Sequence, residues 1–284
     1  MKKNQISTTA MGIAAMRAIE SERPAGQRIC YDPYARRFAG PIFYYLARLF
    51  SGYGEKRAPG VQGFIVCRCR YFDDYLQAWF EAGADQVVIL GAGLDSRAYR
   101  GELQRRATRV FEVDSPATQA GKMKRVKALF GALPPNVTYV SIDFNEETLD
   151  KLRACGYDPA LKTLFLWEGV SYYLNAEAVD ATLVWVRSNS ASGSAIIFDY
   201  LYTAALTSQR QRGEIKRMQR YSGVTGEKLV FGIERGKIED FLNRRGFTHV
   251  VDANAAWIKS LYCTGPNQGR AVAEVYAIVH AEVE

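Results

Sequence analysis

The sequence predicts an α/β fold with a doubly wound, mostly parallel sheet of seven strands, helices at the N-terminus and an inserted cap. Two observations predict it. From residue 86 onward, short apolar runs alternate with helical stretches, which is typical of parallel strands covered on both faces. Before residue 85 the apolar residues recur at helical spacing instead. The predicted strands are Val87–Leu90, Val110–Val113, Val137–Ser141, Thr163–Trp167, Ala195–Asp199, Phe247–Val251 and Ala271–Val279.

Local signals bound several of the predicted helices. The segment Ser7-Thr8-Thr9 can cap a helix that runs through Ile19, and Pro33 suits the first turn of the next helix. Gly246 ends a helix that begins at Ile238. The other predicted helices are Phe64–Phe80, Pro116–Leu129, Glu146–Cys155 and Ala176–Asn189.

We expect one domain over residues 1–284. Residues 1–84 form its helical N-terminal region, residues 85–200 a cofactor-binding core, and residues 236–284 the last strands of the sheet. Residues 201–235 interrupt the alternation with a polar, basic stretch punctuated by glycine, which predicts a cap or lid.

Composition argues against several classes of protein. No apolar run approaches the roughly 20 residues that span a bilayer, and the N-terminus lacks the apolar core of a signal peptide. We therefore expect a cytoplasmic protein with no membrane partner. The five cysteines are scattered and odd in number, which argues against a disulfide framework or a zinc site. The two histidines, His249 and His280, lie in apolar stretches, so no metal site is predicted.

Basic residues gather at 121–127 and 209–217 in a chain of net charge +7. Either run could attract an anionic substrate or nucleic acid. An exposed helix face explains the first run more simply, so no nucleic-acid partner is expected.

A glycine turn follows the first predicted strand. Gly91 and Gly93 permit a tight turn and a close approach of backbone to ligand, although two glycines can also serve packing. Asp114 ends the next strand, where a carboxylate can bind ribose hydroxyls. The turn lacks the third glycine of the dinucleotide motif, and Asp95 would repel a pyrophosphate. The pattern favours S-adenosylmethionine, which has an ammonium, a sulfonium and no phosphate.

Carboxylates follow four of the predicted strands along the chain: Asp114, Asp143, Glu168 and Asp199. Open α/β sheets bind ligands at the carboxyl ends of their strands. One such aspartate could simply cap a helix, but four that converge on one crevice predict a ligand site.

Six segments, taken together, resemble a known family: 8–20, 32–35, 68–74, 90–97, 111–116 and 167–174. They are similar to segments of the leucine carboxyl methyltransferase superfamily, within the class I S-adenosylmethionine-dependent methyltransferases. The chain most resembles the bacterial small-molecule O-methyltransferases, including the polyketide carboxyl methyltransferase type. The resemblance covers nearly the whole chain and implies a Rossmann-like fold.

The resemblance also implies S-adenosylmethionine as cofactor and a role for each matching residue. Arg68 resembles the arginine that holds the cofactor carboxylate, although pairing with Asp73 or Asp74 is an alternative. Asp114 resembles the ribose-binding acid, and Glu168 the acid near the amino group. Asp143 and Phe144 resemble the pair that flanks adenine. The predicted cofactor set is Arg17, Arg68, Gly91, Gly93, Asp95, Asp114, Ser115, Asp143, Phe144 and Glu168.

The methyl acceptor is less determined. Because histidine is scarce, we expect catalysis by positioning rather than by a base, with Tyr172, Tyr173 and Tyr200 as candidate positioning residues. This favours a carboxylate or acidic hydroxyl of a small molecule, of the secondary-metabolite type that the resemblance implies. Tyr202 joins those three tyrosines in the predicted substrate wall, although all four could instead pack the cap against the sheet. A protein C-terminus or tRNA as acceptor, and a non-catalytic cofactor-binding module, remain alternatives.

Overall fold

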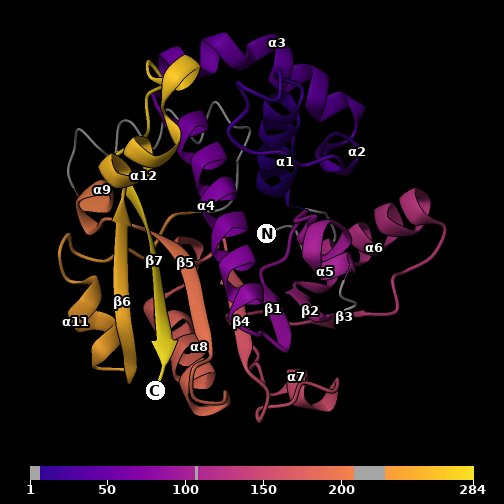
Figure 1. The fold of residues 1–284 in the computed structure, drawn as a ribbon, viewed down its shortest axis with the longest axis vertical. Helices are drawn as coiled ribbons and strands as arrows, with labels where there is room; N and C mark the ends of the chain where they lie inside the picture. The colour runs from indigo at the N-terminus through magenta and orange to yellow at the C-terminus, as the bar shows by residue number, and fades with distance from the viewer. Residues whose placement is uncertain (1–6, 106–107, 208–227) are drawn as a thin grey trace.

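Seven strands form one sheet in the order β3-β2-β1-β4-β5-β7-β6, in a computed structural model that describes residues 7–105, 108–207 and 228–284 (Figure 1). Strand β7 is antiparallel to both of its neighbours, and the pairs among the first five strands are parallel. The predicted doubly wound, mostly parallel sheet of seven strands is confirmed. The strands are β1 (Gln86–Leu90), β2 (Arg109–Asp114), β3 (Val137–Ser141), β4 (Thr163–Trp167), β5 (Ala195–Leu201), β6 (Phe247–Asn254) and β7 (Tyr276–Val283).

The strand order reverses at β1, which lies between β2 and β4. The chain therefore continues from β1 to β2 on one side and returns to β4 on the other side. A crevice forms between these two connections, beyond the carboxyl ends of the strands. Leu90 pairs with Val113, so Gly91 and Asp114 follow as neighbours at this edge. Every residue of β1, β4 and β5 is buried, which explains their continuous apolar runs.

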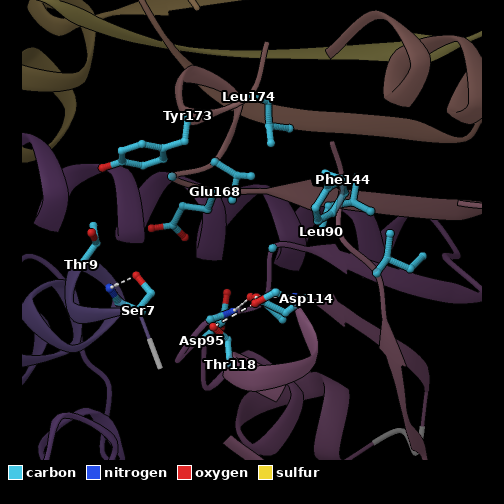
Figure 2. A pocket seen from close by; sticks show the side chains of 18 of the residues that line it. Ser7, Thr9, Leu90, Asp95, Asp114, Thr118, Phe144, Glu168, Tyr173 and Leu174 are labelled. Carbon is cyan, nitrogen blue, oxygen red and sulfur yellow. Dashed lines mark hydrogen bonds between the residues drawn. The ribbon is translucent and has the colours of Figure 1, made fainter. Parts of the chain in front are cut away.

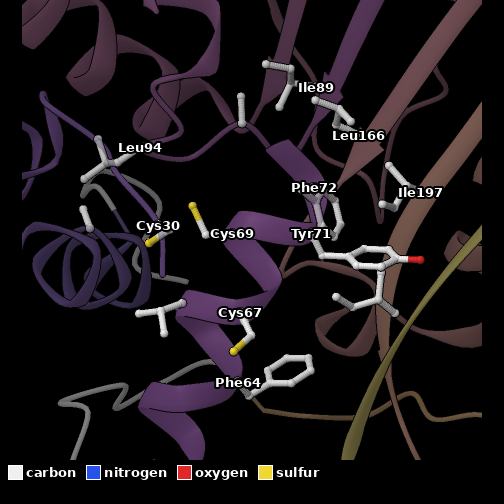
Figure 3. Packing of buried hydrophobic residues seen from close by; sticks show 14 of the residues in the cluster. Cys30, Phe64, Cys67, Cys69, Tyr71, Phe72, Ile89, Leu94, Leu166 and Ile197 are labelled. Carbon is white, nitrogen blue, oxygen red and sulfur yellow. The ribbon is translucent and has the colours of Figure 1, made fainter. Parts of the chain in front are cut away.

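Helices cover both faces of the sheet. On one face, the long helix α4 packs Phe64 and Phe72 in the same cluster as Ile89, Leu166 and Ile197 of the strands (Figure 3). On the other face, α8 and α11 pack against the sheet in a second cluster. The longer described helices are α1 (Thr8–Ser21), α3 (Pro41–Arg57), α4 (Val61–Glu81), α6 (Pro116–Phe130), α8 (Ala176–Ser188) and α12 (Ala255–Tyr262). The shorter ones are α2 (Ala35–Ala39), α5 (Gly101–Arg105), α7 (Lys151–Ala154), α9 (Thr203–Thr207) and α11 (Ile238–Asn243).

The N-terminal helices α1, α2 and α3 lie at one end of the sheet (Figure 1). The predicted cap of α1 is confirmed, because the Ser7 hydroxyl accepts a hydrogen bond of 3.2 Å from the Ala10 amide. This places the first turns of α1 beside the crevice. No helix in the described part of the chain is long and apolar enough to cross a membrane.

Two predicted elements have substantially different bounds in the structure, and one helix was missed. The last strand begins at Tyr276 rather than Ala271, because the preceding segment runs along the start of α4, where the Ala273 amide donates to the Gly60 carbonyl at 2.9 Å. The helix predicted over 146–155 shrinks to α7, since the amide of Glu147 turns back onto the Asp143 carbonyl. Helix α12 was not predicted.

Candidate functional site

A cavity of about 860 Å³ lies at the carboxyl ends of β1, β2, β3 and β4, against the first turns of α1. Its lining includes all ten residues of the predicted cofactor set. Figure 2 shows Glu168 and Tyr173 on one side of this space, Asp95 and Asp114 on the opposite side, and Phe144 at one end. The cavity thus brings together predicted residues as far apart in the sequence as Arg17 on α1 and Glu168 after β4.

The glycine turn is held directly by Asp114. Gly91 and Gly93 have φ values of +65° and +42°, in the region that favours glycine. The Gly93 amide donates to Asp114 Oδ2 at 2.6 Å, and the Ser115 amide donates to Oδ1 at 2.7 Å. Burial raises the pKa of Asp114 although these hydrogen bonds oppose the shift. The Ser115 hydroxyl also donates to Oδ1 at 3.2 Å, so Oδ2 is the oxygen that retains acceptor capacity.

Asp143 and Phe144 lie side by side at the end of β3 and line the same cavity. Asp143 Oδ1 accepts a hydrogen bond of 3.1 Å from the Asn145 amide, which fixes the carboxylate. Phe144 is partly buried and packs against the core. A carboxylate beside a ring suits a flat ligand that has an amino group on its rim.

Arg68 connects two of the predicted carboxylates. Its Nε donates to Glu168 Oε1 at 2.9 Å, and its Nη1 donates to Asp199 Oδ2 at 2.6 Å. The alternative pairing of Arg68 with Asp73 or Asp74 was wrong. In the described residues Nη2 of Arg68 has no hydrogen-bond partner, and the residue lines the cavity. Arg68 can therefore still donate to a ligand.

Arg17 occupies a similar position on α1. Its Nε donates to Asp32 Oδ2 at 3.0 Å and its Nη2 to the Leu94 carbonyl at 2.6 Å. This side chain is 7% exposed and lines the cavity. Two arginines held by buried carboxylates can together bind a ligand carboxylate.

Arg97, which sequence reasoning missed, joins the acidic residues of the site. Its Nη1 donates to Asp95 Oδ2 at 2.5 Å and to Glu168 Oε2 at 2.6 Å, and its Nε donates to Asp73 Oδ1 at 2.6 Å. Although burial opposes ionisation, Arg97 and Arg68 lower the pKa of Glu168. The only sequence signal was an arginine two positions after Asp95, and that spacing does not reveal the partners from α4 and β4.

Comparisons with known proteins identify the family of this chain. The model of the leucine carboxyl methyltransferase family matches residues 10–187. A predicted S-adenosyl-L-methionine-dependent methyltransferase of Mycolicibacterium vanbaalenii is 31% identical over 269 residues, covering 89% of this chain and 87% of the relative. Another from Streptomyces avermitilis is 36% identical over 192 residues, which span 66% of each chain.

The chain belongs to the leucine carboxyl methyltransferase family. It is an S-adenosylmethionine-dependent methyltransferase with a class I methyltransferase fold. Two solved structures share that fold at low sequence identity. A DUF574 family protein from Streptomyces avermitilis has a TM-score of 0.60 at 12% identity, covering 95% of this chain and 97% of that one. A predicted methyltransferase from Thermobifida fusca has a TM-score of 0.58 at 15% identity, covering 100% and 96%.

The charges of the cavity fit this cofactor. Two arginines line it, Arg17 and Arg68, against a larger number of carboxylates. An acidic excess suits a ligand that has an ammonium and a sulfonium but one carboxylate, and it would repel a pyrophosphate. The carboxylates in the lining are Asp95, Asp114, Asp143, Glu146, Glu147 and Glu168.

The four predicted substrate tyrosines of the methyltransferase separate into two groups. Tyr173 lines the cavity, and Tyr172 lies just behind it, where its hydroxyl donates to Asp199 Oδ2 at 3.2 Å. The structure does not bring Tyr200 and Tyr202 to the cavity. Tyr200 faces the opposite side of the sheet from Asp199, because alternate strand residues point to opposite faces, and its hydroxyl donates to Asp252 at 2.9 Å.

The described parts of the predicted cap are residues 201–207 and 228–235. Lys228 and Val230 line the cavity, and the Val230 amide donates to the Tyr172 carbonyl at 2.9 Å. This segment therefore closes the side of the cavity near Tyr173. The basic run at 209–217 and the neighbouring Arg220 lie outside the described residues.

The first basic run is not a continuous exposed patch. Lys122 is 1% exposed, and its ammonium donates to Glu112 Oε1 at 2.7 Å and to the Ala92 carbonyl at 3.1 Å. Arg125 donates to the Phe38 carbonyl at 3.0 Å. The prediction of an exposed helix face was wrong for Lys122. Its side chain is buried and stabilises the glycine turn through the hydrogen bond to the Ala92 carbonyl.

Proposed function

We propose that this methyltransferase transfers the methyl group to a carboxylate or acidic hydroxyl of a small molecule. The supporting observation is the lack of a base suited to neutral pH: no histidine or cysteine occurs among the described residues that line the cavity. Glu168 is held ionised by arginines, and burial raises the pKa of Tyr172 well above its ordinary value. A carboxylate acceptor, with a reference pKa near ~4, needs no base.

In this proposal the protein acts by positioning. Bound S-adenosylmethionine supplies an electrophilic methyl group on its sulfonium. Arg17, Arg68 and Glu168 fix the methionine end, while Asp114 and Asp143 fix the adenosine end. The acceptor must then reach about 3 Å from the methyl carbon, opposite the sulfur.

The acceptor is proposed to enter beside Tyr173 and Val230. These residues give that side of the cavity an apolar and aromatic lining. Lys228 lines the cavity at the same side, two residues before Val230. Its ammonium can attract an anionic acceptor. The resemblance to bacterial small-molecule O-methyltransferases supports the same acceptor class.

Matched acceptors test this proposal. A panel of carboxylic acids, their primary amides and phenols of the same size is incubated with enzyme and cofactor, and S-adenosylhomocysteine and methylated product are measured. We expect turnover of acids but not amides, with kcat/KM for an acid nearly constant between about pH 6 and 9, above its reference pKa. Turnover restricted to amines, or to amides, would contradict the proposal.

The assignment of Asp114 to the cofactor ribose has its own test. Asp114→Asn removes a charged acceptor, and a hydrogen bond to a charged group contributes about 1.5–3 kcal/mol. We expect S-adenosylmethionine to bind roughly ten- to a hundredfold more weakly by titration calorimetry. Asp180→Asn, on the exposed surface of α8, is the matched control and should bind normally. Equal affinities for the two variants would remove the assignment.

A further inference from the structure

We propose that helix α3 lies flat on an anionic lipid surface and makes this methyltransferase a peripheral membrane protein. One face of α3 exposes five large apolar side chains, defined here as the α3 stripe: Ile42 (72% exposed), Tyr45 (58%), Leu46 (49%), Leu49 (75%) and Phe50 (47%). Their spacing of three and four residues places them on one side of the helix. Exposed apolar patches of this kind mark interaction sites.

The side of α3 opposite the stripe anchors the helix to the rest of the molecule. The opposite side of α3 carries Tyr44, which is 2% exposed and packs with Ala18 of α1, and Phe43 and Ala47 pack against the main core. Helix α3 lies across one end of the molecule (Figure 1). A surface can therefore approach it along its length, as an interfacial helix requires.

The positive charge around α3 favours an anionic lipid surface over a neutral one. Residues 35–57 contain five arginines or lysines and a single acid, Glu55. Arg36 and Arg48 both pair with Glu22, so this cluster keeps an excess positive charge beside the stripe. Apolar residues on one side with basic residues at the flanks are typical of helices that bind anionic lipid.

A second copy of the chain fits the stripe less well. A stable protein interface takes roughly 20–30 residues from each partner, whereas the stripe offers five side chains of one helix. Two copies would also bring two positively charged flanks together. The inference departs from the sequence-based prediction of no membrane partner, which rested on the lack of a membrane-spanning run.

Vesicle co-sedimentation of the full chain tests the proposal. The vesicles are phosphatidylcholine alone, or phosphatidylcholine mixed with phosphatidylserine. We expect binding to the phosphatidylserine vesicles that weakens as salt is raised. The double variant Ile42→Glu/Leu49→Glu should reduce binding at least about tenfold, since it removes buried apolar area and adds repelled charge. Leu261→Glu, on α12 and 46% exposed, is the matched control and should bind normally.

Thermal unfolding of all three proteins should give the same midpoint, because the substituted side chains are exposed. Absence of wild-type binding to phosphatidylserine vesicles would overturn the proposal, as would an equal loss with Leu261→Glu. A dimer that the double variant abolishes, without any vesicle binding, would overturn it in favour of contact between two copies.

Discussion

At the scale of single residues, Arg97 holds together several acidic residues at the cavity. Its guanidinium pairs with Asp73 of α4, Asp95 of the glycine turn and Glu168 after β4, while only 3% of the residue is exposed. Buried carboxylates are costly unless they are paired. Arg97 therefore allows two carboxylates of the cavity to stay ionised and at fixed positions before any ligand binds.

Replacing Arg97 by methionine should destabilise the protein strongly. The variant keeps an unbranched chain of similar length but leaves buried carboxylates without their cation, which typically costs about 3–5 kcal/mol. Urea unfolding measures the loss. Arg70→Met is the matched control, because the Arg70–Asp74 pair on α4 is roughly half exposed and should contribute less than about 1 kcal/mol. Similar losses in the two variants would contradict the role given to Arg97.

The position of a residue at the cavity was predictable where that residue directly follows a strand. Asp114, Asp143 and Glu168 reach the cavity because the strand order alone brings their positions together. Arg97 and the Lys122–Glu112 pair were not predictable, since their partners come from elements whose packing the local sequence does not encode. Tyr200 is absent from the cavity lining because it follows Asp199 within β5 and so points to the opposite face of the sheet.

At the scale of elements, the turn after β1 connects the sheet to the cavity at its carboxyl edge. Gly91 has φ of +65°, and a Cβ atom there would lie 2.3 Å from Cγ2 of Val170, which also lines the cavity. The turn thus needs glycine for two separate reasons, backbone conformation and contact with the segment after β4.

Gly91→Ala should reduce both stability and affinity for S-adenosylmethionine. A left-handed backbone costs a non-glycine residue about 1–2 kcal/mol, and here Val170 must also move. Gly101→Ala is the matched control, because Gly101 has φ of +63° and no atom within 4 Å of its Cβ position. We expect urea unfolding to show a lower free energy of unfolding in both variants. Calorimetry should show at least roughly tenfold weaker cofactor binding only for Gly91→Ala, since about 1.4 kcal/mol of binding free energy corresponds to a tenfold change in Kd. Normal cofactor binding by Gly91→Ala would contradict the coupling.

Strands were more predictable than their connections. Every residue of β1, β4 and β5 is buried, so the apolar composition of these runs was enough to predict them as strands. The start of β7 and the existence of α12 depend on distant contacts. A Cβ atom on Gly63 would lie 1.9 Å from the Ala271 carbonyl oxygen, so the segment before β7 is shaped by α4, about 200 residues earlier in the chain.

At the scale of the whole molecule, β7 joins the parallel part of the sheet to its edge strand β6. His280 lies in the middle of β7, opposite Ile197 of β5 and Val251 of β6. Its ring lies 4.3 Å from the ring of Tyr75 and 6.2 Å from that of Tyr71, both on α4. Protonation of His280 would place a charge between the sheet and its longest covering helix.

The stability of the molecule should therefore depend on His280 as pH falls. Burial lowers the pKa of His280 to about 4, against an ordinary value of 6.5. Between these values the unfolded chain binds a proton that the folded protein does not, so the contribution is complete above pH 6.5 and is lost toward pH 4. Between neutral pH and about pH 4.5, we expect the free energy of unfolding to drop by about 2 kcal/mol more in the wild type than in His280→Gln. This difference is smaller than the full pKa shift would give, because the side chain is partly exposed. Urea unfolding at the two pH values measures both proteins, and the carboxylates, such as Asp114 with its pKa raised by burial, are common to both. An identical drop in the two proteins would show that His280 titrates equally in the folded and unfolded states.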